Sequence, residues 1–343
     1  MRDKRSTRGE LDLIGQIRDR FRGIESSRVA LGIGDDCAVL HVPPGSEILV
    51  TTDMSVEGRH FRRDLHSPES AGHRTLARGL SDIAAMGGEP MAAFLSLALP
   101  TETVGTAQGR RWFGRFLDGM HALAEATGTP LAGGDTGETA GALLMADICV
   151  LGSAPRGRAL DRSGARVGDR IYVTGALGGA AAELQGMLSR PGRPGARRRG
   201  PQTFPEPRLA AGQEIRRRRL ATACIDLSDG LSTDLTHLCR ASGVCARIDL
   251  RALPVHPLAL ALKGEGEALG AMLNGGEDYE LLFTAKPGVK APRRLGGVAI
   301  TEIGHITEAA SRPRRGKEFS ITGVDAQGKQ IPIPPGGWEH FGS

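Results

Sequence analysis

The sequence predicts an α/β (α+β) protein built from two domains. Short apolar runs typical of strands alternate along the chain with longer stretches that have helical periodicity. Many of the 49 glycines stand beside Asp or Thr, which is typical of tight turns between strands and helices. The 343 residues are 40% hydrophobic but only 4% aromatic, so Ala, Val, Leu and Ile must build the cores. We place the domains at residues 1–152 and 153–343.

The first domain is predicted to follow the order helix, strand, strand, helix, strand, helix, strand, strand. Apolar residues at helical spacing predict a helix over residues 10–21. A Ser-Pro pair opens a second helix over 67–87, and Gly128 ends a long third helix over 104–128. The strands are expected in the apolar runs bounded by glycine, proline or polar residues, at 27–42, 46–56, 90–100, 129–138 and 142–154.

The second domain begins with a strand, a glycine turn and a helix over residues 168–187. The stretch 221–243 predicts a strand, an acidic turn and a helix. Further strands are expected within the runs 245–255, 274–287 and 298–307. The sequence GVDAQGKQ has two glycines and a lysine of a phosphate-binding P-loop, but IPIPPGG follows it and cannot form the required helix. We interpret it as a hairpin turn.

The formal net charge is +5, and the excess lies mainly in two arginine-rich stretches. One is the Pro-, Gly- and Arg-rich segment 189–202, for which the sequence indicates a loop but no role. The other is EIRRRRL at 214–220. Neither has the interleaved aromatic residues of a single-strand binder, so we interpret both as solvated surface and expect no nucleic-acid partner.

The cysteines and the apolar segments bear on where the protein works. The five cysteines are odd in number and form no CxxC pair, which favours reduced thiols over a disulfide framework or a zinc knuckle. The N-terminal residues contain no apolar stretch of the signal-peptide type. No uncharged apolar run approaches 18 residues, so no membrane span is expected. We therefore expect a cytoplasmic protein.

Acidic residues recur at the ends of apolar runs, beside Gly, Ser or Thr. Any one of them could be a helix N-cap or a turn former. Several carboxylates brought together without cations would raise one another's pKa and cost desolvation free energy. Mg²⁺, which binds oxygen ligands and bridges carboxylates to phosphates, would offset both effects. The residues concerned are Asp35, Asp36, Asp53, Asp82, Asp135, Asp226, Asp229, Glu277 and Asp278.

The flanking glycines add to this interpretation, because they let backbone N–H groups approach phosphate oxygens. The sequence thus predicts a protein that holds a polyphosphate through several Mg²⁺ ions without a P-loop. The strand, glycine turn and helix at 173–184 lack GxGxxG and a clear acidic residue further on, so they do not indicate a dinucleotide site.

In these motifs the chain resembles the thiamine-monophosphate kinase family, within the superfamily of aminoimidazole ribonucleotide synthetase. The resemblance covers nearly the whole chain. Each motif is common alone, but their order and spacing are specific, and GGEDYEL with the terminal WEHF favours this family over its relatives. The matching stretches are GIGDDCAVL, TTDMSVEGRHF, LSDIAAMGGEP, AGGDT, GRALDRSGARVGD, IDLSDGLSTDL, GGEDYELLFT and GGWEHF.

The resemblance implies three sets of site residues. The implied Mg²⁺ ligands are Asp36, supported by Asp35, together with Thr51, Thr52, Asp53, Asp82, Asp135, Asp226 and Asp229. The implied contacts to ATP are Gly134, Asp135, Arg162 and Ser228. The implied contacts to thiamine phosphate are His60, Glu277 and Trp338. His60 could instead be an ordinary loop histidine, and Trp338 could only anchor the tail.

The resemblance also implies a fold and a reaction. The fold is the two-domain aminoimidazole ribonucleotide synthetase-like fold, with the N-terminal domain pairing across a homodimer. ATP would phosphorylate thiamine phosphate to thiamine diphosphate by direct in-line transfer, assisted by several Mg²⁺ ions. The attacking phosphate oxygen is already ionised, so no residue is expected to act as a catalytic base.

Three alternatives stay open at this point. Another ATP-using activity of the same superfamily would use the same acidic turns. Clustered Asp residues also serve two-metal hydrolysis, although a phosphohydrolase would be expected to add histidine ligands, and only His60 lies near an acidic motif. A nucleotide-sensing scaffold would be expected to lack some of the carboxylates.

Overall fold

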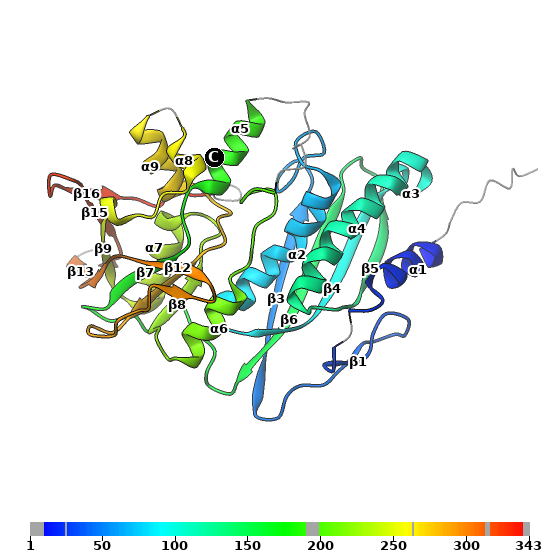
Figure 1. Ribbon diagram of the computed structural model, residues 1–343, viewed down its shortest axis with the longest axis horizontal. Coiled ribbons are helices and arrows are strands. Elements are labelled where there is room, and N and C mark those ends of the chain that lie inside the picture. Colours follow the sequence, from blue (N-terminus) through cyan, green and yellow to red (C-terminus); the bar gives the residue numbers. More distant parts are fainter. Residues whose placement is uncertain (1–9, 25, 190–198, 263, 313–315, 339–343) are drawn as a thin grey trace, which may run out of the picture. The chain divides into compact units, whose positions relative to one another are not determined.

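The computed structural model describes residues 10–24, 26–189, 199–262, 264–312 and 316–338. These residues form two compact units (Figure 1). The first unit contains residues 10–80 and 90–153, and the second contains 81–89, 154–189 and 199–338.

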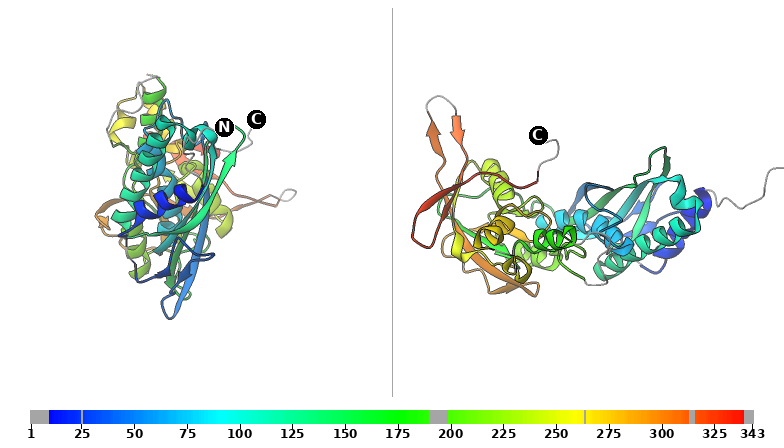
Figure 2. Two further views of the ribbon diagram at one scale, coloured as in Figure 1. Left: turned by 90° about the vertical axis from the view of Figure 1, so that its right-hand side faces the viewer. Right: turned by 90° about the horizontal axis from the view of Figure 1, so that it is seen from above.

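The first unit is a four-stranded sheet with helices against one face. The sheet order is β3-β6-β4-β5, and α2 and α4 cover one face of it (Figures 1 and 2). Three elements, α2, β4 and β6, each have one end in the second unit. The elements are α1 (Glu10–Phe21), β1 (Val29–Leu31), β2 (Val39–Leu40), β3 (Ser46–Val56), α2 (Pro68–Ala85), β4 (Glu89–Pro100), α3 (Thr101–Gly105), α4 (Ala107–Thr127), β5 (Leu131–Thr139) and β6 (Met145–Pro155).

The predicted third helix over 104–128 corresponds to α4, and its first two residues belong to a separate short helix, α3. The chain breaks at Thr106, whose backbone is extended with φ −108° and ψ 153°. Its hydroxyl accepts a hydrogen bond from the N–H of Gly109 at 2.9 Å, so Thr106 is the N-cap of α4. Gly128 ends α4 in the left-handed conformation, as the sequence predicted. The helical periodicity was correct, but it did not reveal the cap inside the run.

The predicted strand over residues 27–42 is two short antiparallel strands, β1 and β2. Between them the chain leaves the extended conformation at Gly32–Ala38, the segment that contains Asp35 and Asp36. The acidic pair therefore lies in a loop rather than within a strand.

The second unit is a larger sheet covered on both faces. Its strand order is β16-β15-β9-β12-β7-β10-β8, with β11 pairing to β12 beside this path. The elements are β7 (Arg170–Thr174), α5 (Gly179–Leu188), α6 (Leu209–Arg217), β8 (Ala223–Asp226), α7 (Leu231–Ser242), β9 (Cys245–Asp249), the 3₁₀ turn η1 (Leu250–Ala252), α8 (Pro257–Leu260), α9 (Glu265–Asn274), β10 (Leu281–Ala285), β11 (Arg294–Leu295), β12 (Val298–Thr307), β13 (Ala310–Arg312), β14 (Gly316–Glu318), β15 (Ile321–Val324) and β16 (Gln330–Ile333).

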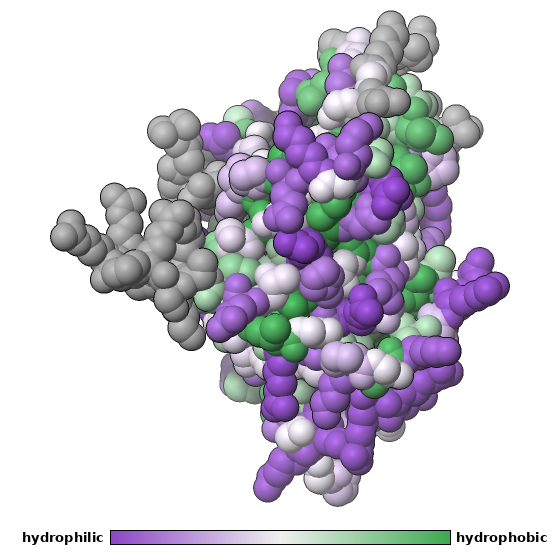
Figure 3. Space-filling view, turned by 90° about the vertical axis from the view of Figure 1, so that its left-hand side faces the viewer, coloured by the Kyte–Doolittle hydropathy of each residue, from purple (hydrophilic) through white to green (hydrophobic). Residues whose placement is uncertain are grey.

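Successive side chains of β7 point to opposite faces of the sheet and pack in two different hydrophobic cores. Ile171 and Val173 pack in one core with Leu235 of α7, whereas Tyr172 packs in the other with Ile215 of α6. The strands β15 and β16 pair antiparallel, which confirms the hairpin predicted at 323–330. On the face seen from the side of β15 and β16, hydrophilic residues surround smaller hydrophobic areas (Figure 3).

The interpretation of EIRRRRL as solvated surface is confirmed for Arg217, Arg218 and Arg219, which are exposed, but it is wrong for Arg216. Arg216, in the arginine-rich stretch that we interpreted as solvated, is only 8% exposed. Its Nε donates to the carbonyl of Gly87 at 2.6 Å, and a terminal nitrogen lies 3.4 Å from a carboxylate oxygen of Glu89. The guanidinium is buried because it has a carbonyl and a carboxylate to satisfy it. Most of the other arginine-rich segment, residues 190–198, lies outside the described residues.

Within the described part of the chain, no helix is both long and apolar enough to cross a bilayer.

Candidate functional site

The first unit has a cavity of about 1200 Å³, which lies between the loop that contains Asp35 and Asp36 and the strands β4 and β5. Asp35 and Asp36 reach it from the loop between β1 and β2. Gly134, Asp135 and Thr136 reach it from β5. The structure therefore brings together Asp36 and Asp135, which are 99 positions apart in the sequence.

Position 134 must be glycine because β4 and β5 approach each other closely there. Its φ is +149°, and a Cβ atom there would lie 1.9 Å from the carbonyl oxygen of Leu95. In the parallel β4–β5 pair, Leu95 is opposite Gly134 and Ser96 is opposite Asp135. This packing lets the backbone of Gly134 line the cavity without a side chain beside Asp135.

The proposed ligands Thr51, Thr52 and Asp53 lie elsewhere in the first unit. They are on β3, at the opposite edge of the sheet from β5. Three strand spacings of about 4.8 Å each place β3 roughly 14 Å from β5. Asp53 accepts a hydrogen bond from Arg78 of α2 at 3.2 Å. Because side chains alternate along a strand, Thr52 points to the other face from Thr51 and Asp53.

His60 lies in the turn that follows β3. Its Nδ1 accepts a hydrogen bond from the N–H of Val56 at 3.0 Å, so in the neutral ring Nε2 carries the proton. Its carbonyl accepts from Arg74 of α2 at 2.7 Å. These bonds fix both the backbone and the ring of His60.

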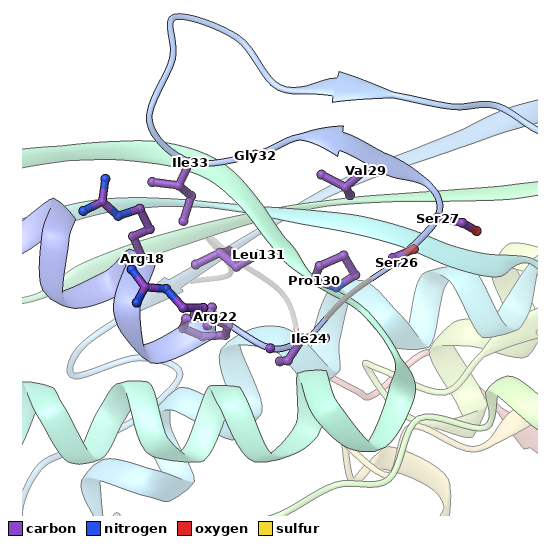
Figure 4. A pocket seen from close by; sticks show the side chains of 12 residues that line it. Arg18, Arg22, Ile24, Ser26, Ser27, Val29, Gly32, Ile33, Pro130 and Leu131 are labelled. Atoms are coloured by element: carbon purple, nitrogen blue, oxygen red, sulfur yellow. The ribbon is translucent and has the colours of Figure 1, made fainter.

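A second cavity of the first unit, of about 550 Å³, adjoins the first and shares Arg18, Gly32, Ile33 and Leu131 with it. Arg18, from the last turn of α1, and Arg22, directly after this helix, lie at one end, and Ser26 lies toward the other (Figure 4). Arg22 also donates to Asp19 at 2.7 Å. The edge that carries the acidic loop thus also carries basic side chains.

In the second unit three loops that carry separate sequence motifs meet at the start of α7. The N–H of Glu277 donates to the carbonyl of Ser228 at 2.8 Å. The N–H of Trp338 donates to the carbonyl of Asp229 at 3.2 Å. The N–H of Gly337 donates to the hydroxyl of Thr233 at 3.0 Å. Five predicted site residues, Asp226, Ser228, Asp229, Glu277 and Trp338, are therefore contributed by one small region of this unit.

A group of carboxylates marks the same region. Asp226, at the end of β8, is 7% exposed and accepts a hydrogen bond from the hydroxyl of Ser81 at 2.7 Å. Asp234, in the first turn of α7, accepts from the N–H groups of Asp229 and Gly230 at 3.1 and 3.0 Å. Burial and the charges of Asp226 and Asp229 raise the pKa of Asp234 well above its ordinary value. These charges repel one another in the absence of a cation.

Asp82 belongs to the second unit and follows Ser81 directly in α2. The backbone of Asp82 is thus next to the residue that donates to Asp226.

Glu277 and its neighbour have unusual environments. The φ of Glu277 is +68°, in the left-handed region that non-glycine residues seldom adopt. Asp278 accepts hydrogen bonds from the N–H groups of Gly178 and Ala180, at 2.6 and 3.1 Å, where α5 begins. Burial raises the pKa of Asp278 to about 7. Asp278 thus fixes the loop against α5, and Glu277 carries the strained backbone.

Arg162 stands apart from these loops. Its carbonyl accepts from the hydroxyl of Ser242, the last residue of α7, at 3.3 Å. The predicted Asp229 and Trp338 are at the start of this helix. At 1.5 Å per residue, twelve residues separate the two ends by about 18 Å. The backbone of Arg162 is therefore not part of the group at the start of α7.

Sequence reasoning missed Ser81, Gln202 and Asp234. Asp234 stands beside a predicted acidic turn and could have been found as an acidic residue in the first turn of a helix. Ser81 precedes the predicted Asp82, but nothing in the sequence shows that its hydroxyl faces Asp226. Gln202 donates from its side chain to Glu277 at 3.3 Å, and no sequence signal indicates this.

The donors in both units fit Mg²⁺ rather than a softer metal. They are carboxylate and hydroxyl oxygens, and the hydroxyl of Thr136, beside Asp135, is buried without a hydrogen-bond partner among the described residues. Among those residues, no three His, Cys, Asp or Glu side chains are grouped to hold a metal by themselves. Mg²⁺ does not need such a cage, because it usually takes one or two carboxylates, waters and substrate phosphates.

Two family models match most of the chain. The N-terminal domain of AIR synthase related protein matches residues 34–154, and the C-terminal domain of the same family matches residues 166–313.

Individual relatives agree with these models. The chain is 43% identical to the thiamine-monophosphate kinase of Salmonella typhimurium strain LT2 over 86% of its own length and 87% of the relative. It is similar to a thiamine-monophosphate kinase structure from Stenotrophomonas maltophilia K279a, with 32% identity, TM-score 0.72 and 90% and 95% of the two chains covered. AaThiL complexed with AMPPCP and TMP gives 29% identity and TM-score 0.70, with 97% of each chain covered. The chain therefore belongs to the thiamine-monophosphate kinase family of AIR synthase related proteins.

Proposed function

We propose that this chain transfers the γ-phosphoryl group of ATP to thiamine phosphate and forms thiamine diphosphate. The observation that carries the proposal is the meeting of the IDLSDG, GGEDYEL and GGW motifs at the start of α7, through the backbone bonds of Glu277 and Trp338. A relative with the same fold is complexed with TMP and with AMPPCP, an ATP analogue. The 43% identical kinase supports the same activity.

Two sets of oxygen donors would hold Mg²⁺ and phosphate. In the first unit, Asp36 and Asp135 line one cavity, which Gly134 also lines. Thr51, Thr52 and Asp53 would bind further ions from β3. In the second unit, the ligands would be Asp82, Asp226 and Asp229, and Ser228 would contact the phosphates of ATP. Arg162, whose backbone lies at the last residue of α7, would contact the phosphates of ATP only through its side chain. Mg²⁺ would neutralise part of the negative charge on ATP and on thiamine phosphate, which repel each other as they approach.

The chain's own residues need only align the reactants. The terminal phosphate oxygen of thiamine phosphate is ionised at neutral pH, so it attacks the γ-phosphorus without losing a proton to a base. The bond from that phosphorus to the bridging oxygen of ADP breaks as the new bond forms. The proposal therefore assigns no catalytic acid or base.

In the second unit, Glu277 and Trp338 would bind the thiamine end, and the contact of His60, in the first unit, stays a prediction. Glu277 is an anion suited to a cationic ring, and Trp338 is 52% exposed, which leaves its indole accessible for stacking. The ring of His60 is held by Val56, so its remaining nitrogen has a defined direction.

We further propose that the N-terminal domain, residues 1–152, pairs across a homodimer, and that residues 153–343 form the other domain. Support comes from β3, an edge strand whose outward-facing Ile48, Val50 and Met54 are exposed hydrophobic residues. Such an edge and face favour association. All five cysteines are free, which suits the reducing cytoplasm that we propose as its location.

The experiment is incubation of the purified protein with thiamine phosphate, ATP and MgCl₂, followed by chromatography of the products. We expect thiamine diphosphate and ADP in equal amounts, and no product when EDTA removes the metal. ADP formed only with a different acceptor would indicate another activity of the superfamily. Inorganic phosphate without thiamine diphosphate would indicate a hydrolase.

A further inference from the structure

A short turn, residues 200–204, is fixed to helix α5 of the second unit by one carboxylate. Glu183 of α5 accepts hydrogen bonds from the N–H of Gln202 at 2.7 Å and from the N–H of Thr203 at 3.2 Å. Its other oxygen accepts from the hydroxyl of Thr203 at 2.9 Å. Within the turn, the N–H of Phe204 donates to the carbonyl of Gly200 at 2.8 Å. The N–H of Gly200 also donates to the hydroxyl of Thr203 at 3.0 Å, and together these bonds define the conformation of the turn.

The turn directs the Gln202 side chain at a proposed substrate contact. Gln202 is only 2% exposed, and its Nε2 donates to Oε2 of Glu277 at 3.3 Å. The backbone of Glu277 is held from the other side by Ser228. The carboxylate of Glu277 is therefore oriented by a buried amide that is 75 positions away in the sequence.

We propose that Gln202 is a positioning residue for Glu277, and that Glu183 acts through Gln202 by holding the turn. This inference rests on the proposed function, in which Glu277 binds the thiamine end of the substrate. Neither residue touches the reacting phosphates in this proposal, so neither is catalytic.

The chemistry of the amide suits this task. The thiazolium ring of thiamine is a cation, and a carboxylate attracts it only while the carboxylate stays ionised and uncompensated. A Lys or Arg at position 202 would orient Glu277 but would also neutralise it. A neutral amide donates one hydrogen bond and leaves the negative charge available to the substrate. The amide of Gln202 thus gives the carboxylate a direction and adds no charge of its own.

The test uses four variants of the full chain in steady-state kinetics. Gln202→Ala removes the donor, and we expect the KM for thiamine phosphate to rise about tenfold, as for one lost hydrogen bond to a charged group. Gln202→Lys keeps a donor but adds a positive charge, and it should raise the same KM. In both variants kcat and the KM for ATP should stay within twofold. Gln185→Ala, an exposed glutamine on the same helix, is the control and should change nothing.

The anchor is tested with the fourth variant, Glu183→Gln, alone and combined with Gln202→Ala. Because Glu183 acts through Gln202, the double variant should be no worse than Gln202→Ala. If Gln202→Ala fails to fold, the shorter amide in Gln202→Asn provides the same comparison. A KM for thiamine phosphate within twofold of the wild type in a folded Gln202 variant overturns the inference. An equal loss in kcat and both KM values also overturns it, because it indicates a general structural role. A wild-type protein without kinase activity contradicts the proposed function instead.

Discussion

Gly337→Ala is expected to detach the tail from the start of α7 without altering either core. A Cβ atom at position 337 would lie 2.0 Å from the carbonyl oxygen of Asp229 and 2.7 Å from the hydroxyl oxygen of Thr233. Real Cβ contacts are never so short, so the tail must move away. The same two oxygens accept the hydrogen bonds from Trp338 and Gly337, at 3.2 and 3.0 Å. A single methyl group therefore removes both bonds.

The size of the effect follows from those two bonds. Each contributes about 1 kcal/mol net, so their loss weakens docking of the tail by about 2 kcal/mol. If docking holds Trp338 in place for thiamine phosphate, the KM for that substrate should rise roughly 30-fold. Trp338→Ala should raise it by about 5- to 30-fold, the value of one cation–π contact of about 1–2 kcal/mol. In both variants kcat and the KM for ATP should change little, because the contact is equal in ground and transition states.

The assay is coupled detection of ADP with each substrate varied in turn. Gly270→Ala is the matched control, since a Cβ atom at this position in α9 meets no atom within 4 Å. Thermal unfolding of all three variants shows whether the cores are intact. If Gly337→Ala lowers only the melting temperature and keeps the wild-type KM, Trp338 anchors the tail and does not position the substrate.

The remaining predictions concern the metal set, one titrating carboxyl and the dimer. Asp53→Asn should lower kcat by about 10²-fold, because it removes a negative charge that we assign to Mg²⁺ binding. Asp53 also accepts a hydrogen bond from Arg78 at 3.2 Å, and an unchanged kcat would show that its role is structural. Burial raises the pKa of Asp278 to about 7, so the folded state retains a proton that the unfolded chain releases near its ordinary value of 3.8. The free energy of unfolding should therefore fall as pH rises from about 4 to 7, and urea titrations of Asp278→Asn should lack this component. Light scattering should find a dimer of the wild-type protein at micromolar concentration. Val50→Glu, which places a charge on β3 at a site that is 63% exposed, should shift the equilibrium toward the monomer. A monomeric wild-type protein would refute the pairing.

The order of elements was largely predictable because periodicity and turn residues carry it. The strand, acidic turn and helix at 221–243 are β8, the turn and α7, as predicted. The break at Thr106 was not predictable from periodicity, because an N-cap residue within an apolar pattern also suits an uninterrupted helix. The burial of Arg216 was not predictable either, since its partners Gly87 and Glu89 come from a distant part of the chain.

The residues of the candidate site were predicted, but which of them lie together in the fold was not. Asp36 and Asp135 were predicted and share one cavity, yet nothing local in the sequence places Asp53 at the opposite edge of the same sheet. That separation is set by the strand order, which depends on packing of the whole unit. The contact between Gln202 and Glu277 is likewise a product of the fold, because it depends on Glu183 holding a turn. The roles of these residues stay predictions.

The most direct test of the central claim follows the terminal phosphoryl group of ATP labelled at the γ position. Direct transfer predicts that the label appears in the terminal phosphate of thiamine diphosphate, with one ADP formed for each labelled product. The reaction should require Mg²⁺ and thiamine phosphate together. Label found in inorganic phosphate, with no labelled thiamine diphosphate, would contradict the account and favour hydrolysis.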